Sequence, residues 1–243
     1  MKWQLHNWMC GAKRIACIDL LSVGSNLSTS DGSGGVSVLL RLLRLVHILL
    51  RNLRTTMSFV TSALLIIDIQ NDYFSGGCME LFRTDETAVQ VRKLLDHFRA
   101  TDRPVVHVQH VSLEHDAEFF IPDTNGVCIN ELVAPLSSEP VVVKHTPNAF
   151  AGTDLQLLLR ELGVEHLVIA GMMTHMCIDS TTRAASDLGF GCTVASDACT
   201  TRNLSFLGTT IMAEVVHATF MASLGQAFAE VTSVDDVIGQ TSS

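Results

Sequence analysis

Short apolar runs alternate with amphipathic segments along most of this chain, beginning just after Met57. The apolar runs are continuous, which is typical of strands in a parallel sheet covered on both faces. The segments between them carry apolar residues at helical spacing. The pattern predicts strands at 63–68, 104–110, 140–144, 166–171 and 191–196, and helices near 86–100, from 153, from 177 and near 207–224.

Strands and helices alternate regularly, so we expect right-handed crossovers and a doubly wound α/β sheet. The helix opening at Thr153 has Gln156 three residues on, which is the spacing of a capping box, and Gly163 as its stop signal. In the helix near 207–224, one buried face is expected to contain Ile211, Val215, Ala218 and Ala222.

Three of the predicted strands end on chemically useful residues. The first stops at Asp68, the third stops at Lys144, and the fourth leads through a short loop to Cys177 at the first turn of a helix. In a parallel sheet these side chains would project from one edge, where open α/β sheets bind ligands. The helix N-terminus would favour a thiolate. The set suggests base, electrostatic partner and nucleophile, although each residue alone is also consistent with a structural role.

Charge and cysteine content exclude several classes of protein. The formal net charge is -9, which argues against nucleic acid as a partner, because binding it requires clustered Lys and Arg. The seven cysteines include no CxxC pair, so neither a disulfide framework nor a zinc knuckle is indicated. The run at 32–35 lacks the features of a nucleotide-binding glycine loop. The composition agrees with a soluble intracellular enzyme, and we expect a cytoplasmic location and no cofactor.

Residues 1–56 differ from the rest of the chain in charge. They hold seven basic and two acidic side chains, a balance of +5, which leaves -14 for the predicted domain at 57–243. Within them, 22–35 is predicted to be a flexible linker and 39–53 an Arg-rich amphipathic helix too short to span a bilayer. This helix is either a membrane-surface or targeting segment, or part of an extension upstream of a true start at Met57. We favour the second interpretation.

Three blocks of sequence carry a resemblance to a known family. The run DIQNDY from Asp68 to Tyr73, Lys144 with the following NAF at 148–150, and GMMTHMC from Gly171 to Cys177 resemble the signature blocks of the isochorismatase-like cysteine hydrolases. That superfamily includes nicotinamidases, N-carbamoylsarcosine amidases, ureidoacrylate amidases and streptothricin hydrolases. The resemblance begins near Ser62 and reaches the C-terminus. Tyr73 stands where Phe is usual, and Met occupies positions where smaller residues are frequent.

The resemblance implies a three-layer fold whose six-stranded parallel sheet has the order 3-2-1-4-5-6, with a short last strand near 229–232. It also implies that Asp68 accepts the Cys177 proton, that Lys144 holds Asp68 and lowers the pKa of the thiol, and that the thiolate attacks an amide carbonyl. The implied oxyanion hole consists of the backbone N–H groups of Met173 and Cys177, with a cis peptide between Met172 and Met173. Because isochorismatases proper lack the cysteine, Cys177 favours amide-type hydrolysis.

Other side chains are weaker candidates for the site. Tyr73 and Phe150 would form an apolar wall of the pocket or belong to the core, and His175 would line the pocket or point to solvent. Asp197, at the end of the fifth strand, is interpreted as the cap of a turn. No metal is expected, because the Asp-x-His pair of nicotinamidases is absent after the second strand. The histidines weighed for such a site are His107, His110 and His115; the first two lie on opposite faces of a strand.

The sequence thus predicts a cysteine-dependent hydrolase of a small amide, ureido or lactam-like compound, acting through a thioester. The alternatives are a nicotinamidase-like, metal-assisted amidase and a catalytically silent binding or assembly module. We expect a homo-oligomer whose ligands are a small amide and water, with membrane contact only if the N-terminal helix is real. An activated Cys177 would react with iodoacetamide at unusually low pH.

Overall fold

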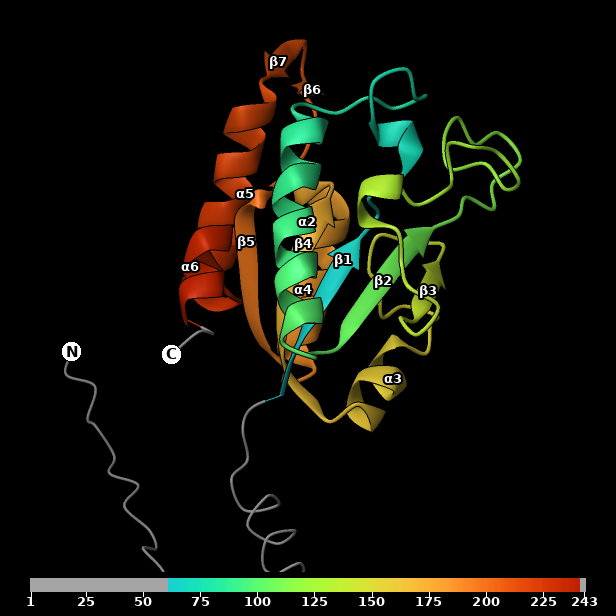
Figure 1. The fold of residues 1–243 in the computed structure, drawn as a ribbon. Coiled ribbons are helices and arrows are strands. Elements are labelled where there is room, and N and C mark those ends of the chain that lie inside the picture. The colour runs from blue at the N-terminus through green and yellow to red at the C-terminus, as the bar shows by residue number, and fades with distance from the viewer. Residues whose placement is uncertain (1–60, 241–243) are drawn as a thin grey trace, which may run out of the picture. The chain divides into compact units, whose positions relative to one another are not determined.

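The structure, a computed structural model, describes residues 61–240, so the predicted linker at 22–35 and helix at 39–53 lie outside the described residues. Its main sheet has the order β3-β2-β1-β4-β5-β8, and every neighbouring pair is parallel. The predicted α/β fold and the order 3-2-1-4-5-6 are confirmed, with β8 as the sixth strand (Figure 1). The strands are β1 (Thr61–Ile67), β2 (Val105–His110), β3 (Val141–Lys144), β4 (Val164–Met172), β5 (Gly191–Thr200) and β8 (Glu230–Thr232).

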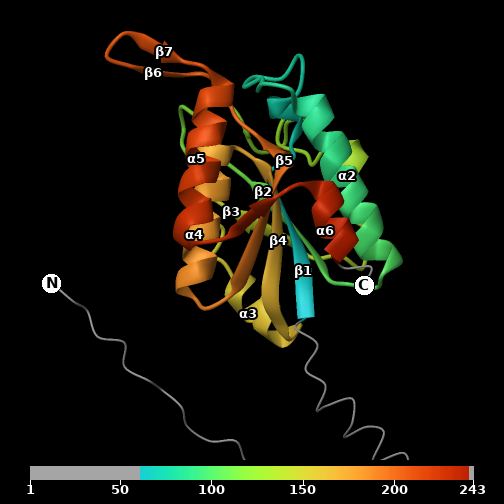
Figure 2. The same ribbon diagram turned by 90° about the vertical axis from the view of Figure 1, so that its left-hand side faces the viewer.

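The two faces of the sheet follow from the alternation of side chains along β1. Leu64 and Ile66 belong to a buried cluster shared with α2 and α6, whereas Leu65 and Ile67 belong to a second cluster shared with α3, α4 and α5. Figure 2 shows the resulting layers, with α2 and α6 on one side of the sheet and α4 and α5 on the other. The helices are α2 (Thr84–Ala100), α3 (Leu155–Glu161), α4 (Asp179–Asp187), α5 (Ala213–Ala227) and α6 (Val234–Gln240).

Helix α3, which follows β3, begins later than the local sequence signals predicted. The residue before α3 is Asp154, so Thr153 is not the N-cap and the predicted capping box with Gln156 is wrong. Thr153 Oγ1 instead accepts a hydrogen bond from the Leu155 N–H (3.3 Å) and donates one to the Ala149 carbonyl (2.6 Å). Gly163 follows the helix with φ 68°, as the predicted stop requires. Among helices formed by residues 61–240, none has the length and apolar character needed to cross a membrane.

The segment predicted as the start of the last helix is a β-hairpin. β6 (Leu204–Phe206) and β7 (Thr209–Ile211) pair antiparallel, and α5 begins only at Ala213. Leu207 and Gly208 both have positive φ, 49° and 78°, as a two-residue type I′ turn requires. The predicted buried face is also wrong, because the side chains at 215, 218 and 222 are exposed. The side chains that α5 buries are Ala213, Val216, Met221 and Leu224.

Strands β1 and β4 approach each other closely at their carboxyl ends, where Ile67 faces Gly171. A Cβ atom on Gly171 would lie 2.0 Å from the Ile67 carbonyl oxygen, and the residue has φ 134°. Only glycine fits this position. The close approach places the segment that follows β4 beside Asp68, the residue that follows β1.

Candidate active site

The carboxyl edge of the sheet brings Asp68, Lys144 and Cys177 together, although they lie at or after the ends of three separate strands, β1, β3 and β4. Lys144 Nζ lies 2.8 Å from Asp68 Oδ2 and 3.3 Å from Cys177 Sγ. Asp68 and Lys144 are completely buried, and Cys177 is 4% exposed. The sheet order explains the geometry, because Lys144 on β3 must reach across β2 to meet β1 and β4. The three side chains therefore form one contiguous, enclosed polar cluster.

His110 is a member of this cluster that the sequence analysis did not place there. It is the last residue of β2, in register with Lys144, and its Nδ1 lies 2.8 Å from Lys144 Nζ. An ammonium group can only donate, so Nδ1 accepts and the neutral ring carries its proton on Nε2. Burial, Lys144 and His145 lower the pKa of His110 to about 4, which agrees with a neutral ring. The sequence signal that could have identified His110 is its position as the last residue of β2, the strand between β1 and β3.

Gln70 fixes the backbone of His110 from both sides. Its Nε2 donates to the His110 carbonyl (2.8 Å), and its Oε1 accepts from the His110 N–H (2.8 Å). The same Nε2 donates to the Val127 carbonyl (2.7 Å), which attaches the long connection after β2 to the edge of the sheet. Gln70 lies inside the first sequence block, but an uncharged side chain gave no chemical reason to single it out.

The charges in the cluster set the resting protonation state. Burial raises the pKa of Asp68, and the Lys144 ammonium opposes this rise only in part. Burial lowers the pKa of Lys144, but Asp68 and Cys177 outweigh it and the net direction is upward. Burial and the Asp68 carboxylate raise the pKa of the Cys177 thiol despite Lys144. The raised pKa of the thiol favours a neutral Cys177 at rest beside the Lys144–Asp68 ion pair, whereas the sequence analysis expected a lowered thiol pKa.

The backbone around the cluster departs from regular geometry. Asp68 has φ 52°, a left-handed conformation that is unusual for a residue other than glycine. Cys177 lies in a π turn at Thr174–Ile178 that continues directly into α4, so the helical segment starts three residues before the position predicted. The Ile178 N–H donates to the Met173 carbonyl (3.2 Å) across this turn. The peptide bond between Met172 and Met173 is cis. The oxyanion role of the Met173 and Cys177 N–H groups stays a prediction.

Aromatic rings border the cluster on the side of the long connection. Tyr73 is 1% exposed, and its ring lies 4.7 Å from that of Phe120, which lies 5.7 Å from the ring of His110. Burial raises the pKa of the Tyr73 hydroxyl, and the nearby Asp68 carboxylate adds to the rise. Phe119 packs against both Tyr73 and Phe120. The two phenylalanines escaped sequence analysis because they lie in an irregular segment with no periodicity to place them.

Two other candidates make their contacts elsewhere. Phe150 stacks on Phe190, just before β5, with ring centroids 6.0 Å apart, which favours the core interpretation. His175 Nδ1 is hydrogen-bonded to Thr201 Oγ1 (2.5 Å), and its ring meets Phe220 edge-on. Neither contact involves the side chains of the buried cluster.

The histidines weighed as metal ligands do not form a metal site. His107 is buried, and its Nε2 contacts Glu139 Oε2 (3.0 Å), which also pairs with an arginine. Donor atoms of Asp68, His110 and Cys177 do lie within 4.8 Å of one another. However, the Lys144 ammonium contacts all three of these side chains, so a cationic group already occupies the position between them. These residues do not fit a metal ion.

Comparison with known proteins agrees with the fold described above. The isochorismatase domain model matches residues 62–236. The isochorismatase family protein YddQ of Bacillus subtilis is 49% identical over 176 residues, which cover 72% of this chain and 98% of that protein. A solved structure from Oleispira antarctica, described as an isochorismatase hydrolase, is 48% identical with a TM-score of 0.73 and covers 76% of this chain and 99% of its own.

A streptothricin hydrolase of Streptomyces noursei is 31% identical over 142 residues, which cover 58% of this chain and 50% of that protein. The domain match spans the whole sheet from β1 to β8, together with the edge that carries Asp68, Lys144 and Cys177. The chain therefore belongs to the isochorismatase family of hydrolases.

Proposed function

We propose that this protein is a cysteine hydrolase that cleaves the C–N bond of a small amide, ureido or lactam-like compound through a thioester. The observation that carries this proposal is the contact of one buried ammonium, Lys144 Nζ, with both Asp68 Oδ2 (2.8 Å) and Cys177 Sγ (3.3 Å). A thiol, a carboxylate acceptor and a fixed positive charge are the groups that an activated sulfur nucleophile requires.

The first half of the reaction forms the thioester. The Cys177 proton passes to the Asp68 carboxylate as the sulfur attacks the carbonyl carbon, so the thiolate exists only while the new C–S bond forms. Asp68 Oδ1 is buried and has no hydrogen-bond donor within residues 61–240, which leaves it free to accept that proton. The tetrahedral oxyanion then collapses, the C–N bond breaks, and the proton on Asp68 moves to the leaving nitrogen.

The second half releases the acid. Water attacks the thioester carbonyl while Asp68, again a carboxylate, takes one of the water protons. The C–S bond breaks, the sulfur recovers the proton as a neutral thiol, and the cluster returns to its resting state. The raised pKa of Asp68 suits this double role, because a more basic carboxylate is a better proton acceptor.

Lys144 is fixed by its partners throughout the cycle. Its ammonium is hydrogen-bonded to Cys177 Sγ and His110 Nδ1 and forms an ion pair with Asp68 Oδ2, so three partners hold it in place as charge moves between carboxylate and sulfur. A buried pair of charges is costly to desolvate and is weak support for stability. A binding or assembly module would have no use for a buried ion pair beside a cysteine, which argues against the silent alternative.

The enclosure of the cluster favours a small substrate. Asp68, Lys144 and Cys177 are buried or nearly so, and the rings of Tyr73 and Phe120 lie close by. Burial keeps water away from the cluster, which suits a compact carboxamide or ureido group beside an apolar or planar portion. The relative named as a streptothricin hydrolase supports a low-molecular-weight substrate over a protein one.

The test combines product release with a covalent intermediate. The full chain is incubated with a panel of small carboxamides, ureido acids and lactams, and ammonia or amine release is measured. Samples quenched during turnover are analysed by mass spectrometry for an acyl group on Cys177. We expect at least one compound to give release and an adduct that is absent from Cys177→Ala. Turnover of a panel member with no acyl adduct, and with full activity in Cys177→Ala, would contradict the proposal.

A further inference from the structure

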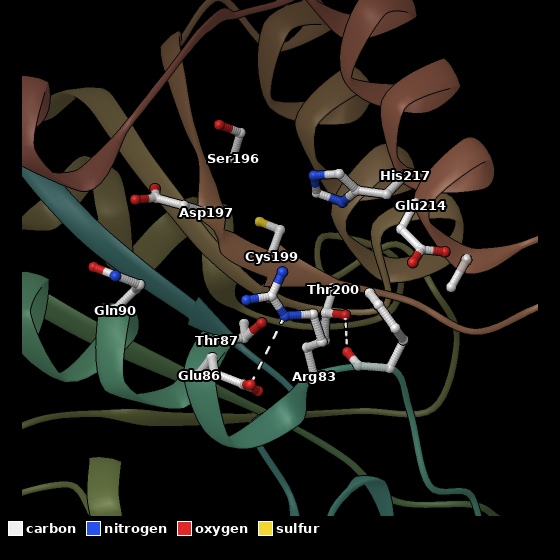
Figure 3. Close-up of a pocket in the computed structure, with 12 residues that line it drawn as sticks. Arg83, Glu86, Thr87, Gln90, Ser196, Asp197, Cys199, Thr200, Glu214 and His217 are labelled. Carbon is white, nitrogen blue, oxygen red and sulfur yellow. Dashed lines mark hydrogen bonds and ion pairs between the residues drawn. The ribbon is translucent and has the colours of Figure 1, made fainter.

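A second cavity, of about 280 Å³, lies between α2, the end of β5 and the start of α5. It arises from an irregularity in the sheet: Ile169 faces Val194, but the next residue pair is Gly171 with Cys199. One residue of β4 is thus matched by four residues of β5, and such bulges redirect side chains out of the regular pattern. Figure 3 shows Ser196, Asp197 and Cys199 from this part of β5 along one side of the cavity.

Two hydrogen bonds hold the bulge in place, so it forms a fixed wall of the cavity. Ser196 Oγ donates to the Thr232 carbonyl (3.0 Å), and Asp197 Oδ1 accepts the Val234 N–H at the start of α6 (2.8 Å). Asp197 therefore lies inside β5 and caps a helix, whereas the sequence analysis placed it at the end of the strand as the cap of a turn. Cys199 is 5% exposed and contributes an apolar surface, since burial raises the pKa of its thiol to about 12.

The wall opposite β5 contains an unsatisfied acceptor. Gln90 extends from α2, and its Oε1 is buried without a hydrogen-bond partner among residues 61–240. A buried carbonyl oxygen left without a donor costs free energy, so such a group in a folded protein calls for an explanation. A ligand that offers an N–H group would supply the missing donor.

The charged groups around the cavity are mostly negative. Glu86, Asp197 and Glu214 carry carboxylates, whereas Arg83 is the single Lys or Arg side chain in the lining and is paired with Glu86 (3.8 Å). His217 adds no positive charge, because burial lowers its pKa. In Figure 3 the acidic side chains come from three different elements, α2, β5 and α5. The surplus of negative charge favours a cation and disfavours an anion.

We propose that this cavity is a second ligand site that takes a small organic amine, with the ammonium donating to Gln90 Oε1 and facing the carboxylates. The apolar part of the ligand would lie against Cys199 and Ala213. The volume suits a ligand of roughly ten heavy atoms and is at the lower limit of drug-like pockets. None of the lining residues belongs to the buried cluster of Asp68, Lys144 and Cys177.

The site is linked to the turn that carries Cys177. His217 lines the cavity, and its Nδ1 is hydrogen-bonded to Thr174 Oγ1 (2.9 Å), at the first residue of the π turn. Thr174 is fully buried, so displacement of the His217 ring would be transmitted to the turn. A bound amine would thus alter the environment of Cys177 through this turn.

The binding test compares two probes of similar size and opposite charge. 2-Phenylethylamine and 3-phenylpropanoate are titrated into the full chain by calorimetry, and the bound position is checked by crystallography. We expect saturable binding of the amine and none of the acid. Gln90→Leu and Glu86→Gln should each weaken the amine by about tenfold. Asp85→Asn, the same charge change on the same helix outside the cavity, should leave the affinity unchanged.

Three results would overturn the assignment. One is equal binding of the amine and the acid. Another is a loss of affinity in Asp85→Asn as large as that in Glu86→Gln. The third is loss of amine binding in Cys177→Ala, which would place the ligand at the buried cluster instead. Because binding is measured without turnover, failure of this test and failure of the proposed hydrolase function are distinguishable.

The link to the turn has its own readout. The rate of Cys177 alkylation by iodoacetamide, followed by mass spectrometry, should change at least twofold when the amine is saturating. In Thr174→Val, which keeps the shape but removes the hydroxyl, the amine should bind with unchanged affinity and the alkylation rate should no longer respond. A response that persists in Thr174→Val would show that the coupling does not pass through His217.

Discussion

Two buried cysteines at the carboxyl ends of neighbouring strands illustrate how differently this fold treats the same side chain. Cys177 and Cys199 are 4% and 5% exposed. Cys177 Sγ lies 3.3 Å from the Lys144 ammonium, which in turn contacts a carboxylate. Burial raises the pKa of the Cys199 thiol too, to about 12, and its charged neighbour is the Asp197 carboxylate, which adds to the rise. Burial alone makes a cysteine inert, and the charged groups around it determine whether it can react.

The two regions also differ in how their polar groups are satisfied. At the buried cluster the ammonium of Lys144 meets the carboxylate of Asp68, the sulfur of Cys177 and the ring of His110 within the protein. In the second cavity the Gln90 carbonyl has no such partner. The free acceptor at the buried cluster, Asp68 Oδ1, lies among Lys144 and Cys177 and is suited to proton transfer, whereas the free acceptor in the cavity, Gln90 Oε1, is suited to binding a donor.

The largest effect is expected from removal of the proposed nucleophile. Cys177→Ala should lower turnover of any accepted amide by roughly 10⁴-fold or more, because the covalent pathway is lost. The matched control is Cys192→Ala, which removes another buried thiol from the same core and should lose little activity at temperatures where it is folded. Residual turnover above a few per cent in Cys177→Ala would remove the cysteine from the mechanism.

Substitution of the two charged partners should come next in size. Asp68→Asn and Lys144→Met should each lower the rate by roughly 10²–10⁴-fold, since they remove the proton acceptor or the charge that holds it. Neither should add to the loss in Cys177→Ala, because residues that act as one unit are non-additive. Kinetics of the three double mutants provide the measurement. Fully additive losses would mean that the three residues do not cooperate in one step.

The sequence was informative wherever one signal was local and repeated. Continuous apolar runs located the strands, and their last residues identified Asp68 and Lys144, because strand ends at one edge must meet. Prediction from the sequence failed where contacts between distant segments determine the local structure. His110 joins the cluster only because β2 lies between β1 and β3, and the hairpin at 204–211 depends on a left-handed Leu207 that no propensity favours. Burial of the site raises the pKa of the Cys177 thiol, where a lowered pKa was expected. The sequence alone does not show that the site is buried.

Alkylation of Cys177 tests that reversal directly. In the resting protein iodoacetamide should modify the exposed Cys128 before Cys177, and the Cys177 rate should rise with pH, because its raised pKa leaves little thiolate. Asp68→Asn should accelerate the reaction and Lys144→Met should slow it, since the carboxylate raises the thiol pKa and the ammonium lowers it.

Each unit of pKa corresponds to about tenfold in thiolate, so peptide mass spectrometry over a pH series can resolve these opposite shifts. Both variants are expected to be inactive, which separates this readout from catalysis. If Cys177 of the unsubstituted protein is labelled before Cys128 near neutral pH, the prediction of a neutral resting thiol is wrong.

His110 should have a smaller effect that depends on what replaces it. His110→Asn keeps an acceptor near Lys144 and should be impaired only a few-fold, whereas His110→Leu leaves one ammonium donor unpaired and should lose about tenfold or more. Steady-state rates of the two variants at one pH make the comparison. Equal losses would show that the hydrogen bond to Lys144 is not what His110 contributes.

The same residue predicts a pH window for stability. The pKa of His110 is lowered to about 4 in the folded protein, while an unfolded chain takes up that proton near pH 6.5. Stability from this residue is therefore complete above about pH 6.5 and is lost as the pH falls toward about 4. His110→Asn should remove that part of the acid dependence in urea unfolding measured between these values. An unchanged slope in the variant would contradict a neutral His110.

The smallest effect is expected from removal of metal ions. A hydrolase can polarise its carbonyl with a cation or with fixed N–H donors, and a catalytic metal site needs several imidazole or carboxylate ligands around an open position. Here the donors of Asp68, His110 and Cys177 surround the ammonium of Lys144, and His107 is directed to Glu139 instead. Activity should therefore be unchanged after exhaustive dialysis against EDTA and after addition of Zn²⁺, Fe²⁺ or Mn²⁺, with metal content followed by elemental analysis.

Lys144→Met provides the contrast, because loss of the ammonium opens the position between the three donors and should raise the affinity of the protein for Zn²⁺. Loss of activity on chelation, restored by one of these ions, would instead favour a metal-assisted, nicotinamidase-like amidase and would reassign the role of His110 from partner of Lys144 to ligand.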